Sequence, residues 1–388
     1  MKETLISLLC CCILFMVCSL SAAEEAPELQ PARLLSVISQ DDLPNLFDRS
    51  YTSIWYARRG WIQVDLQPDQ TAYGLYICFH TNVTPVVIQI RNNQGYQDYA
   101  TVSGEYLHQY VSLPGTSSVR IRIADESKKE MLQLAELHLF GSGEKPEWIQ
   151  EWHTASKADL LLLCGHPDDV LLWFGGALPT YAGERGMHVQ VVYLARGDSW
   201  RHNELLDGLW MCGVRDYPIV SPFHDVRTEN RSIVYGAWGG TKVFYPWFVS
   251  VVRRLRPEVL ITQDFNGEYG HAIHQVAAYT AVNCPPLAAD PEFDPPSAAL
   301  YGAWQIKKVY IHLYKQNQIV MDWEQPLTFF NGRTGLEIAN AALECHKSQQ
   351  PIGYSAKASG RYDCRLFGLY ATTVGPDINR NDFFENIN

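Results

Sequence analysis

The hydrophobic pattern of the chain changes near residue 157, and this change limits the folds that the chain can adopt. Before it, short runs such as Trp61–Leu66 and Val119–Ile123 alternate apolar and polar residues. Repeated alternation with a period of two is typical of an antiparallel β-sandwich. After it, Leu160–Cys164 is continuously apolar, as expected of a strand buried on both faces of a parallel sheet. The sequence therefore predicts two domains of different class.

Strands and helices alternate through the second domain. We expect strands at 160–164, 189–194, 217–220 and 259–262, and helices at about 170–184, 201–212, 244–255 and 271–282. This order implies βαβ units. The predicted fold class is therefore α/β, a Rossmann-like, mostly parallel sheet with helices on both faces, preceded by the antiparallel β-sandwich.

Changes in composition suggest five segments along the chain. They are a signal peptide (1–23), a polar linker (24–34), the β-sandwich (35–142), a connector (143–157) and the α/β domain (158–388).

The first residues have the pattern of an export signal. An apolar run from Leu5 to Leu20 precedes the small residues Ala22 and Ala23. The run is short for a membrane span, and bulky residues before Cys18 disfavour a lipid anchor there. We expect a secreted or cell-envelope protein whose mature chain has no transmembrane segment.

Charge and cysteine content exclude two classes of function. The formal net charge is −11 and there is no basic stripe, which argues against a nucleic-acid partner. Ten cysteines are present, and the six beyond the predicted signal peptide show no Cys-x-x-Cys spacing. A cysteine-ligated zinc site is therefore not predicted.

Two short segments carry most of the reactive side chains. Gly165–Asp169 (Gly-His-Pro-Asp-Asp) directly follows the strand 160–164, and Gly267–His274 (Gly-Glu-Tyr-Gly-His-Ala-Ile-His) comes shortly after the strand 259–262. In open α/β sheets, ligands bind beyond the carboxyl ends of the strands. We therefore expect the two segments to meet at that edge.

Two imidazoles and one carboxylate are a sufficient protein set for a catalytic zinc, with water completing the coordination. The metal lowers the pKa of this water toward about 7, and a second carboxylate can accept its proton. Taken alone, the first segment is also a plausible turn, because Pro and Asp favour turns. The two segments together favour a metal site.

Residues 158–388 resemble the PIG-L (LmbE-like) family of N-acetylglucosaminyl deacetylases. The family has a His-Pro-Asp-Asp motif after its first strand and a Tyr-Gly-His-x-x-His segment, matched here by Tyr269–His274. The resemblance implies that Zn²⁺, or another divalent metal, is bound by His166, Asp169 and His274.

The same resemblance assigns roles to residues beside the metal. It implies that Asp168 is the general base, and that His271 and Tyr269 polarise the acetyl carbonyl. Arg201 and Asp225 match positions that contact the sugar; an ion pair of Arg201 with Glu204 and a turn at Asp225 are the alternatives.

Two positions depart from the family pattern. Val170 stands where Glu usually follows the two Asp residues, and Ala272-Ile273 replace a Pro-Asp pair. The missing Asp usually orients or charges the neighbouring histidine, so the role and pKa of His271 stay open.

Residues 35–142 resemble the discoidin family of galactose-binding-like sandwiches. The cues are Leu46-Phe47-Asp48, Trp61–Leu66 and the closing run Leu134–Gly141. In such families this module either binds glycans or serves as a packing spacer. The resemblance therefore allows either a second glycan contact through the sandwich or a purely structural role for it.

These observations predict a secreted, zinc-dependent hydrolase that removes N-acetyl groups from N-acetylglucosamine-type amino sugars or glycoconjugates. The first alternative is a non-catalytic glycan-binding protein with a degenerate deacetylase domain, suggested by Val170 and Ile273. The second is a non-haem iron(II) enzyme, which also uses two His and one carboxylate. The βαβ pattern weighs against the second alternative.

Overall fold

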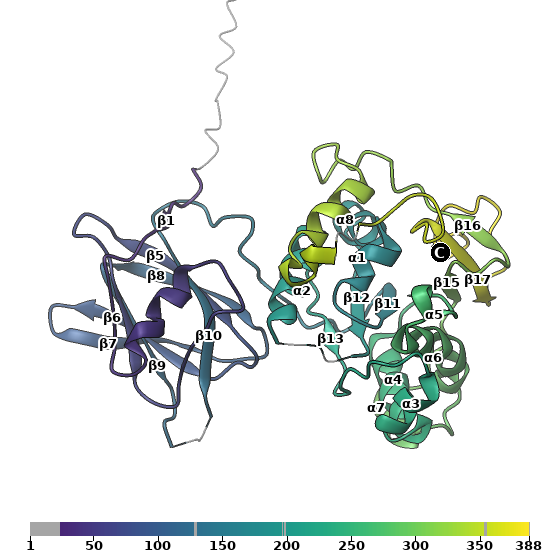
Figure 1. Cartoon of the computed structure of the whole chain (residues 1–388), viewed down its shortest axis with the longest axis horizontal. Helices are drawn as coiled ribbons and strands as arrows, with labels where there is room; N and C mark the ends of the chain where they lie inside the picture. The colour runs from purple at the N-terminus through teal and green to yellow at the C-terminus, as the bar shows by residue number, and fades with distance from the viewer. Residues whose placement is uncertain (1–23, 128–129, 196, 198, 353–354, 388) are drawn as a thin grey trace, which may run out of the picture.

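The computed structural model describes residues 24–387 except 128–129, 196, 198 and 353–354. The predicted signal peptide therefore lies outside the described residues. A β-sandwich, purple to blue in Figure 1, stands beside an α/β domain coloured teal to yellow. The predicted fold class is confirmed.

The sandwich consists of two five-stranded antiparallel sheets. The first contains β1 (Glu28–Leu29), β10 (Leu132–Phe140), β5 (Ala72–Phe79) and β8 (His108–Thr116), with β3 (Trp55–Ala57) also paired to β10. The second contains β2 (Arg33–Ser36), β4 (Trp61–Asp65), β9 (Ser118–Ile123), β6 (Val86–Asn92) and β7 (Gly95–Val102). Their alternating apolar side chains, such as Ile62, Val64 and Ile121, are buried between the sheets. A 3₁₀ segment, η1 (Gln40–Phe47), packs against β10.

The segment predicted as a linker, residues 24–34, is instead part of the sandwich. Leu29 pairs with Leu139, and Arg33 pairs with Asp65 at the start of β2. Leu29 is buried. The linker interpretation was wrong because a strand of two residues leaves no periodic pattern in the sequence.

The α/β domain is built on one seven-stranded sheet. In spatial order its strands are β13 (Ile219–Val220), β12 (Val189–Tyr193), β11 (Leu160–Cys164), β14 (Val259–Thr262), β15 (Lys308–His312), β17 (Leu366–Thr372) and β16 (Gln318–Val320). The first five are parallel, and β17 and β16 are antiparallel additions. The chain order reverses between β11 and β14, which makes their junction the topological switch point of the sheet.

Helices cover both faces of this sheet. Leu160, Leu162 and Cys164 of β11 share a core with α1 (Asp169–Phe174), α2 (Ser199–Met211) and α8 (Gly335–Leu343). Leu161 and Leu163 share another with α3 (Arg231–Ala237), α4 (Thr241–Leu255) and α6 (Ala272–Ala289). The remaining short helices are α5 (Gly267–Gly270), α7 (Pro295–Tyr301) and the 3₁₀ segment η3 (Lys347–Ile352). This two-sided burial explains the continuous apolar run of β11.

Two predicted helices have different lengths in the structure. The helix expected at 170–184 stops at Phe174, because Gly175 has a φ of 51°, and a π-helical segment, η2 (Pro179–Glu184), follows. Helix α6 extends to Ala289 despite two internal prolines. The buried Arg253 donates to the carbonyls of Leu287 and Ala288 and thereby satisfies the end of the helix.

Buried polar contacts join the two domains along α2. His108 Nε2 lies 2.7 Å from Asn203 Oδ1, and the Tyr51 hydroxyl donates to Asp207 over 3.0 Å. Arg201 belongs to the same helix, two residues before Asn203. The sandwich therefore rests on the element that also supplies a predicted substrate-binding residue.

Across residues 24–387, outside the gaps given above, none of the helices combines the length and the apolar character needed to cross a bilayer.

Candidate metal centre

The two predicted motifs meet because β11 and β14 are neighbouring strands. Leu163 of β11 lies beside Thr262 of β14, so the loops that follow leave the same edge of the sheet. The Gly165 N–H donates to Gln263 Oε1 over 2.7 Å and ties the two loops together. A Cβ atom at Gly165 would lie 3.0 Å from His274 Cδ2 and 3.1 Å from Asp169 Oδ2. Glycine is needed here because larger residues would press on both side chains.

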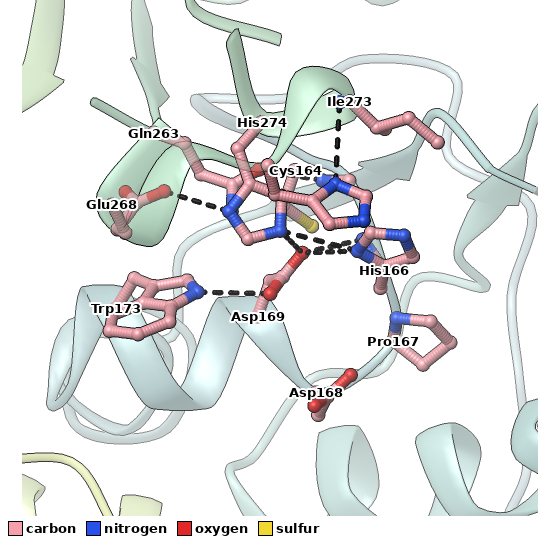
Figure 2. A network of polar contacts seen from close by, with 12 residues as sticks. Cys164, His166, Pro167, Asp168, Asp169, Trp173, Gln263, Glu268, Ile273 and His274 are labelled. Atoms are coloured by element: carbon pink, nitrogen blue, oxygen red, sulfur yellow. Dashed lines mark hydrogen bonds and ion pairs between the residues drawn. The ribbon is translucent and has the colours of Figure 1, made fainter. Parts of the chain in front are cut away.

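Figure 2 shows His166, Asp169 and His274 converging on a common point. Asp169 Oδ2 lies 3.1 Å from His166 Nδ1 and 3.2 Å from His274 Nε2, and the two nitrogens are 3.3 Å apart. In a tetrahedral site with bonds of about 2.0 Å, neighbouring ligand atoms are about 3.3 Å apart. The three side chains therefore fit one divalent cation.

A second set of three ligands is also geometrically available. One nitrogen each from His166, His271 and His274 lies within 4.8 Å of the others. This spacing is wider than in the set that includes Asp169, and His271 serves as the N-cap of α6. We favour the set with Asp169 because its atoms already have the separation that a single ion requires.

Glu268, for which no role was predicted, supports the metal centre from the side away from the cavity. Its Oε2 lies 2.8 Å from His274 Nδ1 and its Oε1 lies 3.0 Å from His312 Nδ1, and all three side chains are fully buried. A carboxylate on the outer nitrogen of a ligand histidine fixes the ring and raises its basicity. Glu268 adopts a φ of 56°, a left-handed conformation that costs energy for a non-glycine residue.

The buried charges of the centre favour a cation. Burial alone would raise the pKa of the Asp169 carboxyl, but His274 and His166 hold it well below its usual range. Burial alone would lower the pKa of His274, but Asp169 and Glu268 raise it to about 10. Two buried carboxylates thus attract positive charge, which protons on the histidines or a metal ion can provide.

Asp168 points away from the three ligands and contacts Arg201. Arg201 Nη2 donates to Asp168 Oδ1 over 2.6 Å, and both side chains are largely buried. Glu204, which the sequence suggested as an ion-pair partner of Arg201, instead accepts hydrogen bonds from the backbone N–H and the hydroxyl of Ser348. Arg201 is therefore placed to orient the carboxylate of Asp168.

His271 stands at the cavity wall as a neutral imidazole. Burial lowers its pKa to about 4, with further lowering from the nearby His166 and His274. The backbone N–H of Ile273 donates to His271 Nδ1 over 3.4 Å, which leaves Nε2 to carry the ring hydrogen. His271 is therefore uncharged near neutral pH and able to donate from Nε2. The ring of Tyr269 lies 5.8 Å from that of His271 and the residue is half exposed.

A cavity of about 460 Å³ opens over these groups. It contains every predicted site residue except His274, which is buried below it. Asp225 lies on its wall, with Oδ1 3.5 Å from His166 Nε2, so this residue faces both the cavity and a ligand histidine. The sequence gave no signal for the lining residues Arg227, Thr228 and Glu229, because they come from a loop without a motif. Gly270 of the second motif and Gln349 of η3 also line the cavity.

The fold and the geometry define an α/β protein with a candidate metal centre at the switch point of its sheet. Searches by sequence give relatives of this domain. A 1D-myo-inositol 2-acetamido-2-deoxy-α-D-glucopyranoside deacetylase of Geodermatophilus obscurus is 47% identical over 180 residues, covering 39% of this chain and 60% of that protein. A deacetylase with the same name from Catenulispora acidiphila is 31% identical over 182 residues, covering 39% and 54%. The resemblance to PIG-L (LmbE-like) deacetylases is confirmed.

The alignments span only about half to three fifths of these relatives. No protein-family model matches the chain. Among solved structures, the N,N′-diacetylchitobiose deacetylase of Pyrococcus horikoshii aligns with 16% identity and a TM-score of 0.38, covering 50% of this chain and 72% of that one. The CBM32 module of AlyQ aligns with 16% identity and a TM-score of 0.26, covering 30% and 99%.

Proposed function

We propose that this protein is a zinc-dependent hydrolase that removes the N-acetyl group from an amino sugar or glycoconjugate. The observation that carries the proposal is the convergence of His166, Asp169 and His274 under a cavity that is also lined by the carboxylate of Asp168. The substrate class is supported by the relatives, whose names specify a 2-acetamido-2-deoxy-glucopyranoside.

His166, Asp169 and His274 would hold the cation, which supplies a Lewis acid and lowers the pKa of water toward about 7. Asp168 accepts a proton from the attacking water, and the water oxygen adds to the acetyl carbonyl. Arg201 orients Asp168 through its 2.6 Å hydrogen bond. Asp168 then gives the proton to the nitrogen as the C–N bond breaks, which yields acetate and a free amine.

The oxyanion that forms on the acetyl group needs hydrogen-bond donors. The neutral His271 offers its Nε2 hydrogen, and Tyr269 lies on the same side of the cavity. Losing one donor of this kind typically lowers the rate by about 10²–10³-fold. Asp225, Arg227 and Glu229 line the rest of the cavity, where they can accept and donate hydrogen bonds to sugar hydroxyls.

We also propose that the chain is exported, because Leu5–Leu20 and Ala22-Ala23 have the pattern of a cleaved signal peptide. N-terminal sequencing of the mature protein tests this directly. A mature chain that retains Met1 would contradict it.

Acetate release from N-acetylglucosamine, N,N′-diacetylchitobiose and longer oligomers tests the main proposal. We expect the full chain to release acetate, to lose this activity with a chelator and to regain it when zinc is restored. If metal-loaded protein binds the oligomers but releases no acetate, the non-catalytic alternative replaces the proposal.

A further inference from the structure

A second cavity, of about 1030 Å³, lies where the sandwich, the connector and α2 come together. It shares no lining residue with the cavity at the metal centre. Its walls combine half-exposed aromatic rings with acidic and basic side chains. This combination of apolar rings and hydrogen-bonding groups suits a ligand with both an apolar face and many polar atoms.

Trp148 provides a supported aromatic surface in this cavity. Its ring lies 5.1 Å from that of His138, 5.7 Å from Tyr76 and 5.7 Å from Phe140, in edge-on or tilted contacts. These contacts hold the ring in place, yet Trp148 is 41% exposed. A fixed and exposed indole ring can stack against the apolar face of a pyranose.

Glu136 provides a buried acceptor that has no partner. Its Oε1 accepts the Ser50 N–H over 2.7 Å, but within the described part of the chain its Oε2 accepts no hydrogen bond. The nearest ring nitrogen, His138 Nε2, is 4.0 Å away, and Glu136 is only 2% exposed. Burial raises the pKa of this carboxyl to about 8. A buried carboxylate oxygen without a donor costs free energy that a bound cation or donor can recover.

Two basic side chains near Glu136 bind another carboxylate instead. Arg49 forms an ion pair with Glu28, and His138 Nδ1 lies 2.7 Å from Glu28 as well. The Asp48 side chain is also within hydrogen-bonding reach of the Glu136 carboxyl, and its negative charge helps to raise the pKa of Glu136. A positively charged group from outside the chain would give Oε2 a partner and offset this repulsion.

From these features we infer that the cavity at the domain junction binds an amino sugar with a free amine. The pyranose ring stacks on Trp148, and the ammonium group contacts Glu136 Oε2. The binding step forms no covalent bond and needs no catalysis. The inference therefore stands apart from the proposed function, although that reaction would generate such an amine.

Calorimetric titration of the full chain with a β-1,4-linked glucosamine tetramer tests this inference, with the N-acetylated tetramer and cellotetraose as comparison ligands. We expect the free-amine tetramer to bind most tightly. Glu136→Gln should weaken its binding about tenfold and remove the preference over cellotetraose. Trp148→Ala should also weaken binding about tenfold, while Trp148→Phe, which keeps an aromatic ring, should retain most of it.

Tyr56→Ala, at an exposed aromatic residue on β3, is the matched control and should bind as the unaltered chain does. Thermal unfolding of each variant identifies any that fail to fold. Unchanged affinity in both Glu136→Gln and Trp148→Ala would place the binding elsewhere and overturn the inference. Equal affinity for the free-amine tetramer and for cellotetraose, which has no N-acetyl group for the metal centre to act on, would overturn it too.

Discussion

Buried polar groups are arranged in opposite ways at the metal centre and at the junction between the domains. At the junction, each nitrogen of His108 has its own partner, the Tyr76 hydroxyl at 2.8 Å and the Asn203 amide oxygen at 2.7 Å. At the metal centre, two imidazole nitrogens and one carboxylate oxygen face one another instead. Matched donors and acceptors hold elements together, whereas converging ligand atoms create a place for a cation. The comparison separates structural histidines from reactive ones.

The largest effect is expected at the metal centre. Asp168→Ala should lower acetate release by about 10²–10⁴-fold, because it removes the general base. The bound metal should remain, since Asp168 is not one of the three converging ligands. Parallel assays of turnover and metal content test this. Asp69→Ala, at an exposed residue of the sandwich, is the control, and normal turnover in Asp168→Ala would rule out the assigned base.

A smaller effect is expected at Glu268, which contacts the ligand His274 but does not itself face the metal. Glu268→Gln removes the carboxylate that fixes His274 and should weaken metal binding by about 10–100-fold. Competition with a chelating dye measures the affinity. Glu292→Gln, at an exposed residue, should leave the affinity unchanged. If Glu268→Gln binds metal as tightly as the unaltered chain, Glu268 has no supporting role.

At the junction between the domains, His108→Leu should lower the free energy of unfolding, with a smaller effect on acetate release at the metal centre. It removes one buried hydrogen-bond partner from the Tyr76 hydroxyl and one from the Asn203 amide oxygen, which costs about 1–3 kcal/mol. Urea unfolding measures the change. His188→Leu, at a largely exposed histidine, is the control. Equal stability of the two variants would show that the junction does not depend on the matched hydrogen bonds.

The smallest expected effect is a pH-dependent stability change at Asp207. Burial raises the pKa of this carboxyl to about 7, so the folded chain binds its proton more tightly than the unfolded chain does. The buried charge therefore destabilises the fold increasingly as pH rises from about 4 to about 7. Asp207→Asn should raise Tm at pH 8 by more than at pH 5. The same Tm difference at both pH values would show that ionisation of Asp207 is not the cause.

The sequence predicted the parts of the site that depend on local pattern. Leu160–Cys164 and the motif after it were identifiable because a buried strand and a polar loop differ sharply in composition. That β14 lies directly beside β11 was not predictable, because strand order depends on how the crossover connections pack.

Other features depend on tertiary contacts that leave no sequence pattern. Glu268 lies within the second motif, and its position six residues before His274 was the one available signal for its supporting role. Its contact with His312, from β15, arises only in the folded sheet. The same is true of Ser348, whose hydroxyl donates to the Glu204 carboxylate that was suggested as a partner of Arg201.

The choice between the two possible ligand sets tests the central claim most directly. Stoichiometric zinc measurement on purified His166→Ala, Asp169→Ala, His274→Ala and His271→Ala variants distinguishes them. With His166, Asp169 and His274 as ligands, the first three variants should lose the metal and His271→Ala should retain it. Retention of zinc by Asp169→Ala together with its loss from His271→Ala would contradict this assignment and identify the three histidines as the ligands.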